Sequence, residues 1–561
     1  MKLINLYLIG LNILAFPTTA LAEYPLIPNT TNQSSLVSQK ETKTDISEAT
    51  KSEESQEKTE TAAESDESKA DELTPEEIAR LKKLATADQL YLSGYKTEAQ
   101  KLYRQAKDVW DIERKRTAKQ DESVKVFDAS AQLSPAGKVF WRNYQQGKEQ
   151  ELESKIFSAL KLLTTREPQF ISGHLHYAQM LQQYERATEA AAVLNRAVNL
   201  YPREPKLISA RIENHINEEE WLDASVLARQ FALFNPDLPE AKEFDRLADE
   251  YLAEYQSDLK SDIAFNAVGN AIVGTVGFAL TGSLLGPLSV LETTSMLLRG
   301  ESAIGNASVN QAKKQLPLLE DPKVTQYVNE IGQKIAAASG RDDFQYEFHL
   351  IMDDSLNAFA LPGGKVFVHA GAIMKTNTEA ELAGLLAHEV SHSALSHGFQ
   401  LVTQGNFTAN IVRHIPYVGN AATGLIVMNY SRGMEKQADI FGTRILVNSG
   451  YAADGVRNLM VKLYESNQDE DNPEPAEWFS SHPNTKNRVR YMEQLIVDNN
   501  LNRYAYEGVA RHQEMKHIVT QQWQKYEKCT EEVVTLEAAR KCLQDMNQTK
   551  DKDVEEEQDK D

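Results

Sequence analysis

The chain has 561 residues and a formal net charge of −22, and 41% of its residues are hydrophobic. A chain of this length is too long for one hydrophobic core and is expected to form two or three domains. The acidic excess is concentrated near the two ends. Residues 23–77 carry 15 acidic and 5 basic residues, and residues 549–561 carry 7 acidic and 3 basic residues. The sequence has no basic patch, so nucleic acid is excluded as the expected partner.

The first 22 residues have the pattern of a signal peptide. Lys2 precedes an apolar run over residues 3–16, and Ala20-Leu21-Ala22 matches a signal-peptidase site. We therefore expect export to the periplasm, with a retained membrane anchor as the alternative. Residues 23–75 are rich in Ser, Thr, Glu and Lys and are expected to form a disordered acidic tether.

Helical repeats are predicted over residues 76–255. Pro168, Pro202 and Pro236 are spaced by 34 residues, which is the length of a tetratricopeptide (TPR) unit. The predicted TPR-like units span about 80–113, 137–170, 171–204 and 205–238, and an ordinary helical bundle is the alternative. A stack of such units has a concave surface that can hold an extended peptide.

Residues 256–305 form a Gly-rich apolar segment, and residues 263–291 within it contain no charged residue. Three interpretations stay open: a buried or cleft-covering helical hairpin, an element that dips into a membrane surface, and a true membrane span. Neither flank is enriched in Lys or Arg, which weakens the third interpretation.

The segment from Thr378 to Gly398 is predicted to be a helix that carries metal ligands. Thr378 and Glu381 form a capping box at its start. His388 and His392 are four residues apart, so both imidazoles project from one helix face and can bind one Zn²⁺. Glu389, beside them, can then take a proton from the attacking water. This is the H-E-x-x-H pattern of zinc proteases.

A second predicted helix, over residues 431–450, supplies the third ligand. Glu435 and Asp439 are four residues apart on one face of this helix. Glu435 suits the third ligand position, and Asp439 suits an acceptor that orients a ligand histidine. A solvated acidic face is the alternative.

Four motifs in this order resemble one family. They are NAFALPGGKVFVHAGAI, HEVSH, YSRGMEKQAD and SSHPNTKNRV. Together they are similar to the gluzincin metallopeptidases of family forty-eight (HtpX and Oma types), and most of all to the soluble periplasmic branch that pairs a protease with TPR repeats. The resemblance implies a mainly α fold with a small β-sheet and a zinc protease domain over residues 306–497.

The resemblance also implies roles for two further regions. Residues 357–361 and 365–369 flank Pro362-Gly363-Gly364 as a β-hairpin, and the family makes this hairpin the substrate-aligning edge, with Asn357, Gly363 and Gly364. His482 and Arg488 match the family's H-P-x-x-x-x-R signature and are assigned to catalysis. His482 can take the fourth zinc position at rest or stabilise the oxyanion, and both roles stay open. His369, His397 and His414 are predicted to be surface or core residues and not ligands.

A helical module is predicted over residues 498–546, followed by an acidic tail over residues 547–561. Cys529 and Cys542 would lie about 19 Å apart on one continuous helix, so a disulfide between them requires a turn. Export favours the disulfide over two free thiols.

These observations predict a periplasmic zinc endopeptidase that binds one Zn²⁺ per chain. Its expected substrates are unfolded or misassembled envelope proteins, and expected partners are the outer-membrane assembly machinery, through the repeats, and a membrane surface. The alternatives are a TPR-based chaperone or adaptor with a locked protease, and a membrane-embedded peptidase of HtpX type.

Overall fold

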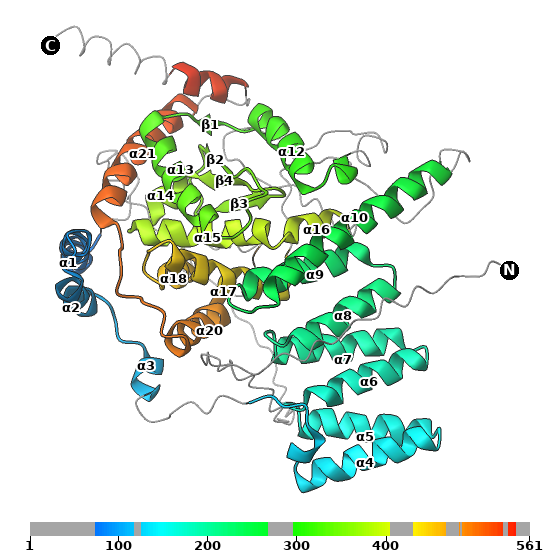
Figure 1. Cartoon of the computed structure of the whole chain (residues 1–561). Coiled ribbons are helices and arrows are strands. Elements are labelled where there is room, and N and C mark those ends of the chain that lie inside the picture. Colours follow the sequence, from blue (N-terminus) through cyan, green and yellow to red (C-terminus); the bar gives the residue numbers. More distant parts are fainter. Residues whose placement is uncertain are drawn as a thin grey trace, which may run out of the picture.

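The computed structural model describes residues 73–116, 125–266, 296–403, 430–466, 482, 485–530 and 537–545. Helices dominate this part of the chain, and a single small β-sheet lies within the C-terminal half (Figure 1). The predicted fold class is therefore confirmed.

The sheet has four strands in the order β1-β2-β4-β3. They are β1 (Leu318–Leu319), β2 (Glu347–Ile351), β3 (Ala358–Leu361) and β4 (Lys365–His369). β2 runs parallel to β4, whereas β1 and β3 are antiparallel to their neighbours. The predicted hairpin is confirmed, with Leu361 opposite Lys365. Its turn needs glycine, because Gly363 and Gly364 have φ angles of +72° and +85°.

Helices cover both faces of the sheet. One face packs on α13 (Pro322–Ala337) and α15 (Glu379–Ala394), and the other on α12 (Glu301–Gln315). Around α15 lie α14 (Ala370–Lys375), α16 (His397–Thr403), α17 (Arg432–Asn448), α18 (Gly455–Ser466) and α20 (Thr485–Asp498). All 16 residues of α15 are buried. The sequence predicts an apolar stripe on one side of this helix only. The burial of its other faces therefore results from tertiary packing.

Six helices form three stacked pairs, which we call the helical array. They are α4 (Pro135–Glu149), α5 (Glu153–Arg166), α6 (Ile171–Gln183), α7 (Ala187–Leu200), α8 (Pro205–Asn217) and α9 (Trp221–Phe234), and α10 (Ala241–Asn266) packs on α9. The turn inside each pair contains a left-handed glutamate: Glu151, Glu185 and Glu219 have φ angles of 53°, 58° and 61°. These turns repeat every 34 residues, so the predicted period is present in the backbone.

The first predicted unit, 80–113, does not stack on this array, which corrects the sequence interpretation. α1 (Pro75–Leu92) and α2 (Lys96–Ala106) form a hairpin whose apolar residues cluster with Tyr504 and Val509 of the C-terminal region. Figure 1 shows this hairpin beside α21 and far from α4. The short helix α3 (Asp111–Arg116) contacts α20, and the 3₁₀ turn η1 (Ser130–Gln132) precedes the array.

Buried charges fix the α1–α2 hairpin in this place. Lys107 has only 5% of its side chain exposed and forms ion pairs with Asp454, at 2.8 Å, and with Glu507. Asp88 accepts hydrogen bonds from the backbone N–H groups of Glu507 and Val509, at 2.8 and 2.9 Å. The hairpin is thus joined to the C-terminal region by polar contacts that would be costly to break.

The predicted C-terminal helical module, 498–546, packs against the helices around the sheet. α21 (Val509–Thr530) and the helical residues 537–545 contribute Met515, Val519 and Leu543 to the apolar cluster that also contains α13 and α15. Cys529 and Cys542 form the predicted disulfide.

Several predictions concern residues outside the described ranges. They are the signal peptide at 1–22, the tether up to residue 72, most of the apolar segment (267–291) and the acidic tail. Among the helices that the structure describes, none combines the length and apolar character needed to cross a bilayer.

Replacing Lys107 by Met should lower the free energy of unfolding by about 3 kcal/mol or more, because Glu507 would stay buried without its cation and Asp454 would keep only Arg503, at 3.4 Å. Chemical denaturation measures this. Lys101→Met is the matched control, since Lys101 is an exposed lysine on α2, the helix that ends just before Lys107, and should change stability by about 0.5 kcal/mol at most. Equal stability of the two variants would contradict the assigned role of Lys107.

Candidate metal centre

The two predicted ligand histidines face each other from consecutive turns of α15. Their Nε2 atoms lie 3.1 Å apart, and both side chains are completely buried. The helix begins as predicted, with the Thr378 hydroxyl accepting the N–H of Glu381 at 3.1 Å. The capping box differs in one partner, because the Glu381 carboxylate accepts the N–H of Asn377 and not that of Thr378.

Helix α17 brings the third predicted ligand to the same point. Oε1 of Glu435 is 3.5 Å from Nε2 of His392, and Oε2 is 3.7 Å from Nε2 of His388. The two helices approach closely at Gly442, where an added Cβ would lie only 3.2 Å from the backbone of Ala387. A larger residue there would push the carboxylate away from the histidines.

Asp439 lies behind the first histidine, as predicted. Its Oδ1 is 3.1 Å from Nδ1 of His388, the ring atom that faces away from Glu435. Burial opposes ionisation of Asp439, but the positive charge of Arg488 and a hydrogen bond to His388 hold the pKa of the carboxyl below its usual value. An ionised Asp439 keeps the proton of His388 on Nδ1, and its Nε2 lone pair then faces the other ligands.

Arg488, which the resemblance assigns to catalysis, contacts both acidic residues of α17. Its guanidinium binds both carboxylate oxygens of Asp439, at 2.8 and 2.6 Å. Its Nη1 is 2.7 Å from Oε2 of Glu435. One buried arginine from α20 therefore fixes both acidic residues of α17.

His482 completes the group. Its Nε2 is 3.9 Å from Oε1 of Glu435, and His388, His392, Glu435 and His482 each offer a donor atom within 4.8 Å of the others. All four residues are buried. A tetrahedral zinc ion with bonds of about 2.0–2.1 Å places its ligand atoms about 3.3 Å apart, so the separations of 3.1–3.9 Å fit such an ion.

Electrostatics supports the same interpretation. Burial raises the pKa of Glu435 well above its usual value, and the nearby Arg488 offsets this only in part. Burial also lowers the pKa of His392 well below its usual value. A cation at this point reverses the penalty on the carboxylate and uses the neutral imidazoles as ligands. The residues present therefore fit a divalent metal ion.

Glu389, the predicted general base, lies at the edge of this group. It is completely buried, and its Oε1 is 3.6 Å from Nε2 of His482. Glu389, which should accept the proton of the water, and His482, which has two proposed roles, are thus close neighbours.

Two residues next to the site were not identified from the sequence as site residues. Tyr430 stacks on the ring of His392, with 3.7 Å between the ring centroids. His397 places its Nδ1 3.1 Å from Nδ1 of His392, and burial lowers the pKa of His397 to about 3. His397 is a core residue and not a ligand, as predicted. So is His369, which contacts Asp353, whereas His414 lies outside the described residues.

The predicted substrate edge is located beside the site, but its glycines have a structural role. β3 is an outer strand of the sheet and packs on α15. The N–H of Gly364 donates to the Ser393 hydroxyl at 2.7 Å, and a Cβ on residue 363 would collide with the backbone of α12 at Ser302. The carbonyl of Asn357 accepts the N–H of His369 within the hairpin. These contacts hold the hairpin in place.

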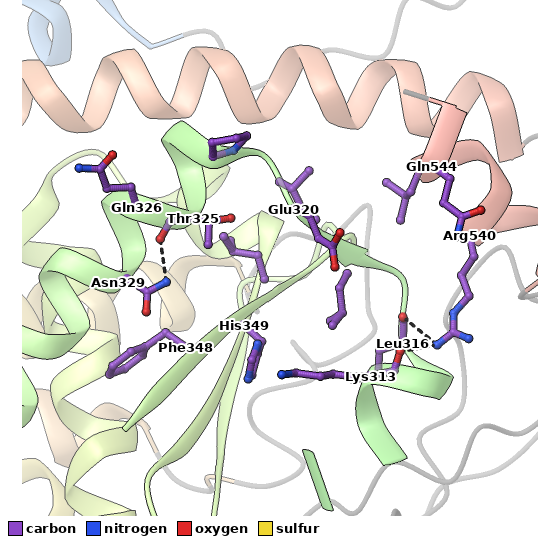
Figure 2. Close-up of a pocket in the computed structure, with 15 residues that line it drawn as sticks. Lys313, Leu316, Glu320, Thr325, Gln326, Asn329, Phe348, His349, Arg540 and Gln544 are labelled. Atoms are coloured by element: carbon purple, nitrogen blue, oxygen red, sulfur yellow. Dashed lines mark hydrogen bonds between the residues drawn. The ribbon is translucent and has the colours of Figure 1, made fainter. Parts of the chain in front are cut away.

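A hollow of about 700 Å³ lies at the opposite edge of the sheet. Figure 2 shows that Lys313, His349 and Arg540 approach it from α12, β2 and the C-terminal helical residues. Neither the ligand group nor Glu389 lines this hollow. It is therefore separate from the metal centre.

Comparison with known proteins agrees with this geometry. The model of Peptidase family M48 matches residues 322–496, which contain the histidines, both acidic residues of α17 and Arg488. The beta-barrel assembly-enhancing protease of Yersinia pestis is 28% identical over 235 residues (38% of this chain and 48% of that protein). The protein of the same name from Escherichia coli is 25% identical over 245 residues (39% and 50%). The mitochondrial metalloendopeptidase OMA1 of Schizosaccharomyces pombe is 29% identical over 186 residues (31% and 53%).

The chain spans about half the length of the curated relatives that it matches. The matched portion is the domain built around α15, so the similarity concerns this domain and not the whole chain.

Replacing Glu435 by Gln should weaken Zn²⁺ binding by at least about tenfold and leave the helical content unchanged, because one ligand charge is lost. Competition with a chromophoric chelator measures the affinity, and circular dichroism measures the fold. Glu379→Gln is the control. Glu379 lies on α15 and is buried like Glu435, but its carboxylate accepts a hydrogen bond from Tyr451. Equal affinity in the two variants would remove Glu435 from the ligand set.

Proposed function

We propose that this chain is a zinc-dependent endopeptidase, because residues 322–496 match the model of Peptidase family M48. The observation that carries the proposal is the buried group of His388, His392 and Glu435 with Glu389 beside it. Three protein ligands plus one exchangeable position are typical of catalytic zinc sites.

Each residue has one task in the proposed reaction. His388, His392 and Glu435 hold the metal, and a Zn²⁺ ion there would polarise the scissile carbonyl and lower the pKa of the attacking water. Glu389 accepts the proton of that water and later passes it to the leaving amine. Asp439 and Arg488 hold the ligands in position and touch no reacting atom. The peptide lies along β3 as an added strand.

We assign His482 to the fourth ligand position at rest. Its Nε2 lies among the other donor atoms and close to Glu389, where it would keep water away from the base. The oxyanion-stabilising role is the alternative, and it requires the same imidazole to turn toward the substrate carbonyl. Either role makes the position of residue 482 decisive for turnover.

We propose unfolded or misassembled envelope proteins as substrates and the periplasm as the location. The relatives from Yersinia pestis and Escherichia coli are named for beta-barrel assembly. The Cys529–Cys542 disulfide fits an oxidising compartment. The helical array, interpreted as TPR-like, offers a half-buried aromatic surface that suits an extended peptide: the Trp141 ring on α4 is 5.2 Å from the His176 ring on α6. Through this surface we expect contact with the outer-membrane assembly machinery.

A second candidate function is a chaperone or adaptor whose protease is locked. The observation that favours it is the complete burial of the ligand group together with His482. The membrane-embedded alternative depends mainly on residues outside the described ranges.

Replacing Glu389 by Gln should reduce hydrolysis of an unfolded protein such as casein by about a hundredfold or more, because the general base is lost. Zinc content should stay at one ion per chain, since Glu389 is not a ligand. Hydrolysis at the wild-type rate by the zinc-loaded variant would contradict the proposed mechanism. If wild type and variant are equally inactive but bind the same client proteins, the chaperone function replaces the enzymatic one.

Replacing His482 by Ala separates the two roles of this residue by the sign of the effect. If His482 is a ligand at rest, casein hydrolysis should increase while zinc stays bound through the other three ligands. If it stabilises the oxyanion, kcat should decrease by about a hundredfold. An unchanged rate would exclude both roles.

A further inference from the structure

The two ligand histidines are supported in different ways. Asp439 faces Nδ1 of His388, as is usual for a histidine ligand. No acidic residue is recorded near Nδ1 of His392 among the described residues, and its neighbour there is Nδ1 of another histidine, His397, at 3.1 Å. Because two imidazole nitrogens form a hydrogen bond only if one carries a proton and the other does not, something must set the direction of this contact.

A chain of side-chain amides sets that direction. Nε2 of His397 is 3.1 Å from Oε1 of Gln437 on α17. Nε2 of Gln437 donates to Oε1 of Gln230, at 3.1 Å. Nε2 of Gln230 donates to the backbone carbonyl of Leu395, at 3.0 Å. Gln230 belongs to α9, the last helix of the array, so one member of this hydrogen-bonded chain comes from outside the protease domain.

The carbonyl of Leu395 determines every proton in the chain, because a carbonyl can only accept. Gln230 must turn its NH₂ group to Leu395 and its oxygen to Gln437. Gln437 must then turn its oxygen to His397, so His397 carries its proton on Nε2. A neutral imidazole has one such proton, and Nδ1 of His397 is therefore an acceptor. Nδ1 of His392 must donate to it, which leaves the Nε2 lone pair of His392 facing the metal position.

We propose that Gln230, Gln437 and His397 form a positioning relay that fixes the tautomer of His392, so that metal affinity depends on how the helical array docks on the protease domain. The inference rests on the proposed zinc function and deepens it. None of the three residues touches the substrate or the metal. All act through His392.

Several contacts fix α9 on the protease domain, as its part in the relay requires. Arg444 of α17 donates to the carbonyls of Leu233 and Phe234 at the end of α9. The rings of Phe234 and Phe441 lie 5.3 Å apart. Leu222 and Val226 of α9 share an apolar cluster with Phe399 and Val402 of α16. Gln230 is thus held between α16 and α17, the two helices that flank the relay.

Zinc affinity of the full-length chain, measured by chelator competition, tests the relay. His397→Leu removes the acceptor and should weaken Zn²⁺ binding by about tenfold to a hundredfold. His397→Asn keeps an acceptor oxygen near the position of Nδ1 and should stay within about threefold of wild type. Equal loss in both variants, or no loss in His397→Leu, would overturn the role of His397.

The contribution of the array is tested by Gln230→Met, which keeps the size of the side chain and removes both hydrogen bonds. It should weaken Zn²⁺ binding by at least about threefold and change the d–d spectrum of the Co²⁺-substituted protein. Arg229→Met is the matched control, because the neighbouring Arg229 bonds only to Asp245 and Asp249 of α10 among its recorded polar contacts.

The outcomes distinguish this inference from the proposed function. If the wild type binds no zinc, the proposed function fails. If the wild type binds zinc and His397→Leu weakens it, but Gln230→Met has the affinity and spectrum of Arg229→Met, the relay ends within the protease domain and the dependence on the array is wrong.

Discussion

The rest of the structure depends on the complete burial of α15. A helix that is buried on every face normally carries apolar residues, but this one carries two imidazoles and a carboxylate near its end. Buried polar groups are stable only when other groups or a metal ion satisfy them. Three neighbouring helices meet that requirement, with Glu435 and Asp439 on α17, Arg488 on α20 and Gln230 on α9. The same contacts therefore pack these helices on α15 and position the residues of the site.

The N-terminal half of the chain is attached to the protease domain at two distant places. Lys107 and Asp88 join the α1–α2 hairpin to the region around Glu507. Gln230 and the end of α9 contact α16 and α17. The helical array lies between these two attachments in the sequence and extends away from the protease domain (Figure 1). Of these two attachments, the one through α9 is linked by hydrogen bonds to His392.

Residue spacing within single helices predicted the centre of the site. Contacts between segments that are distant in the sequence could not be predicted in this way. His388, Glu389 and His392 follow from the spacing of one helix, and Glu435 with Asp439 from the spacing of another. The relay could not be predicted, because Gln230 and Gln437 are 207 residues apart and neither belongs to a motif.

The hairpin of α1 and α2 shows the same limit of prediction from the sequence. Its apolar pattern correctly predicts two packed helices, but a pattern does not state which surface they cover, and Tyr504 and Val509 replaced the expected neighbour α4. His482 and Arg488 were identified only through the family motif, since a His-Pro turn is more often structural.

Under the proposed function, selectivity and chemistry belong to different parts of the chain. A strand that adds to β3 gains main-chain hydrogen bonds that any sequence can form, so this edge binds peptides with little preference. The metal centre adds no preference either, because its donors act on the peptide bond common to all substrates. Discrimination must then come from opening the buried centre or from the array, which carries aromatic side chains such as Trp141. Because α9 belongs to the array and also contacts the residues that support the ligands, an occupied array and an active centre can be coupled without any movement of α15. In that arrangement the fully buried helix α15 carries the two histidines, and coupling to the array would pass through the residues at its periphery.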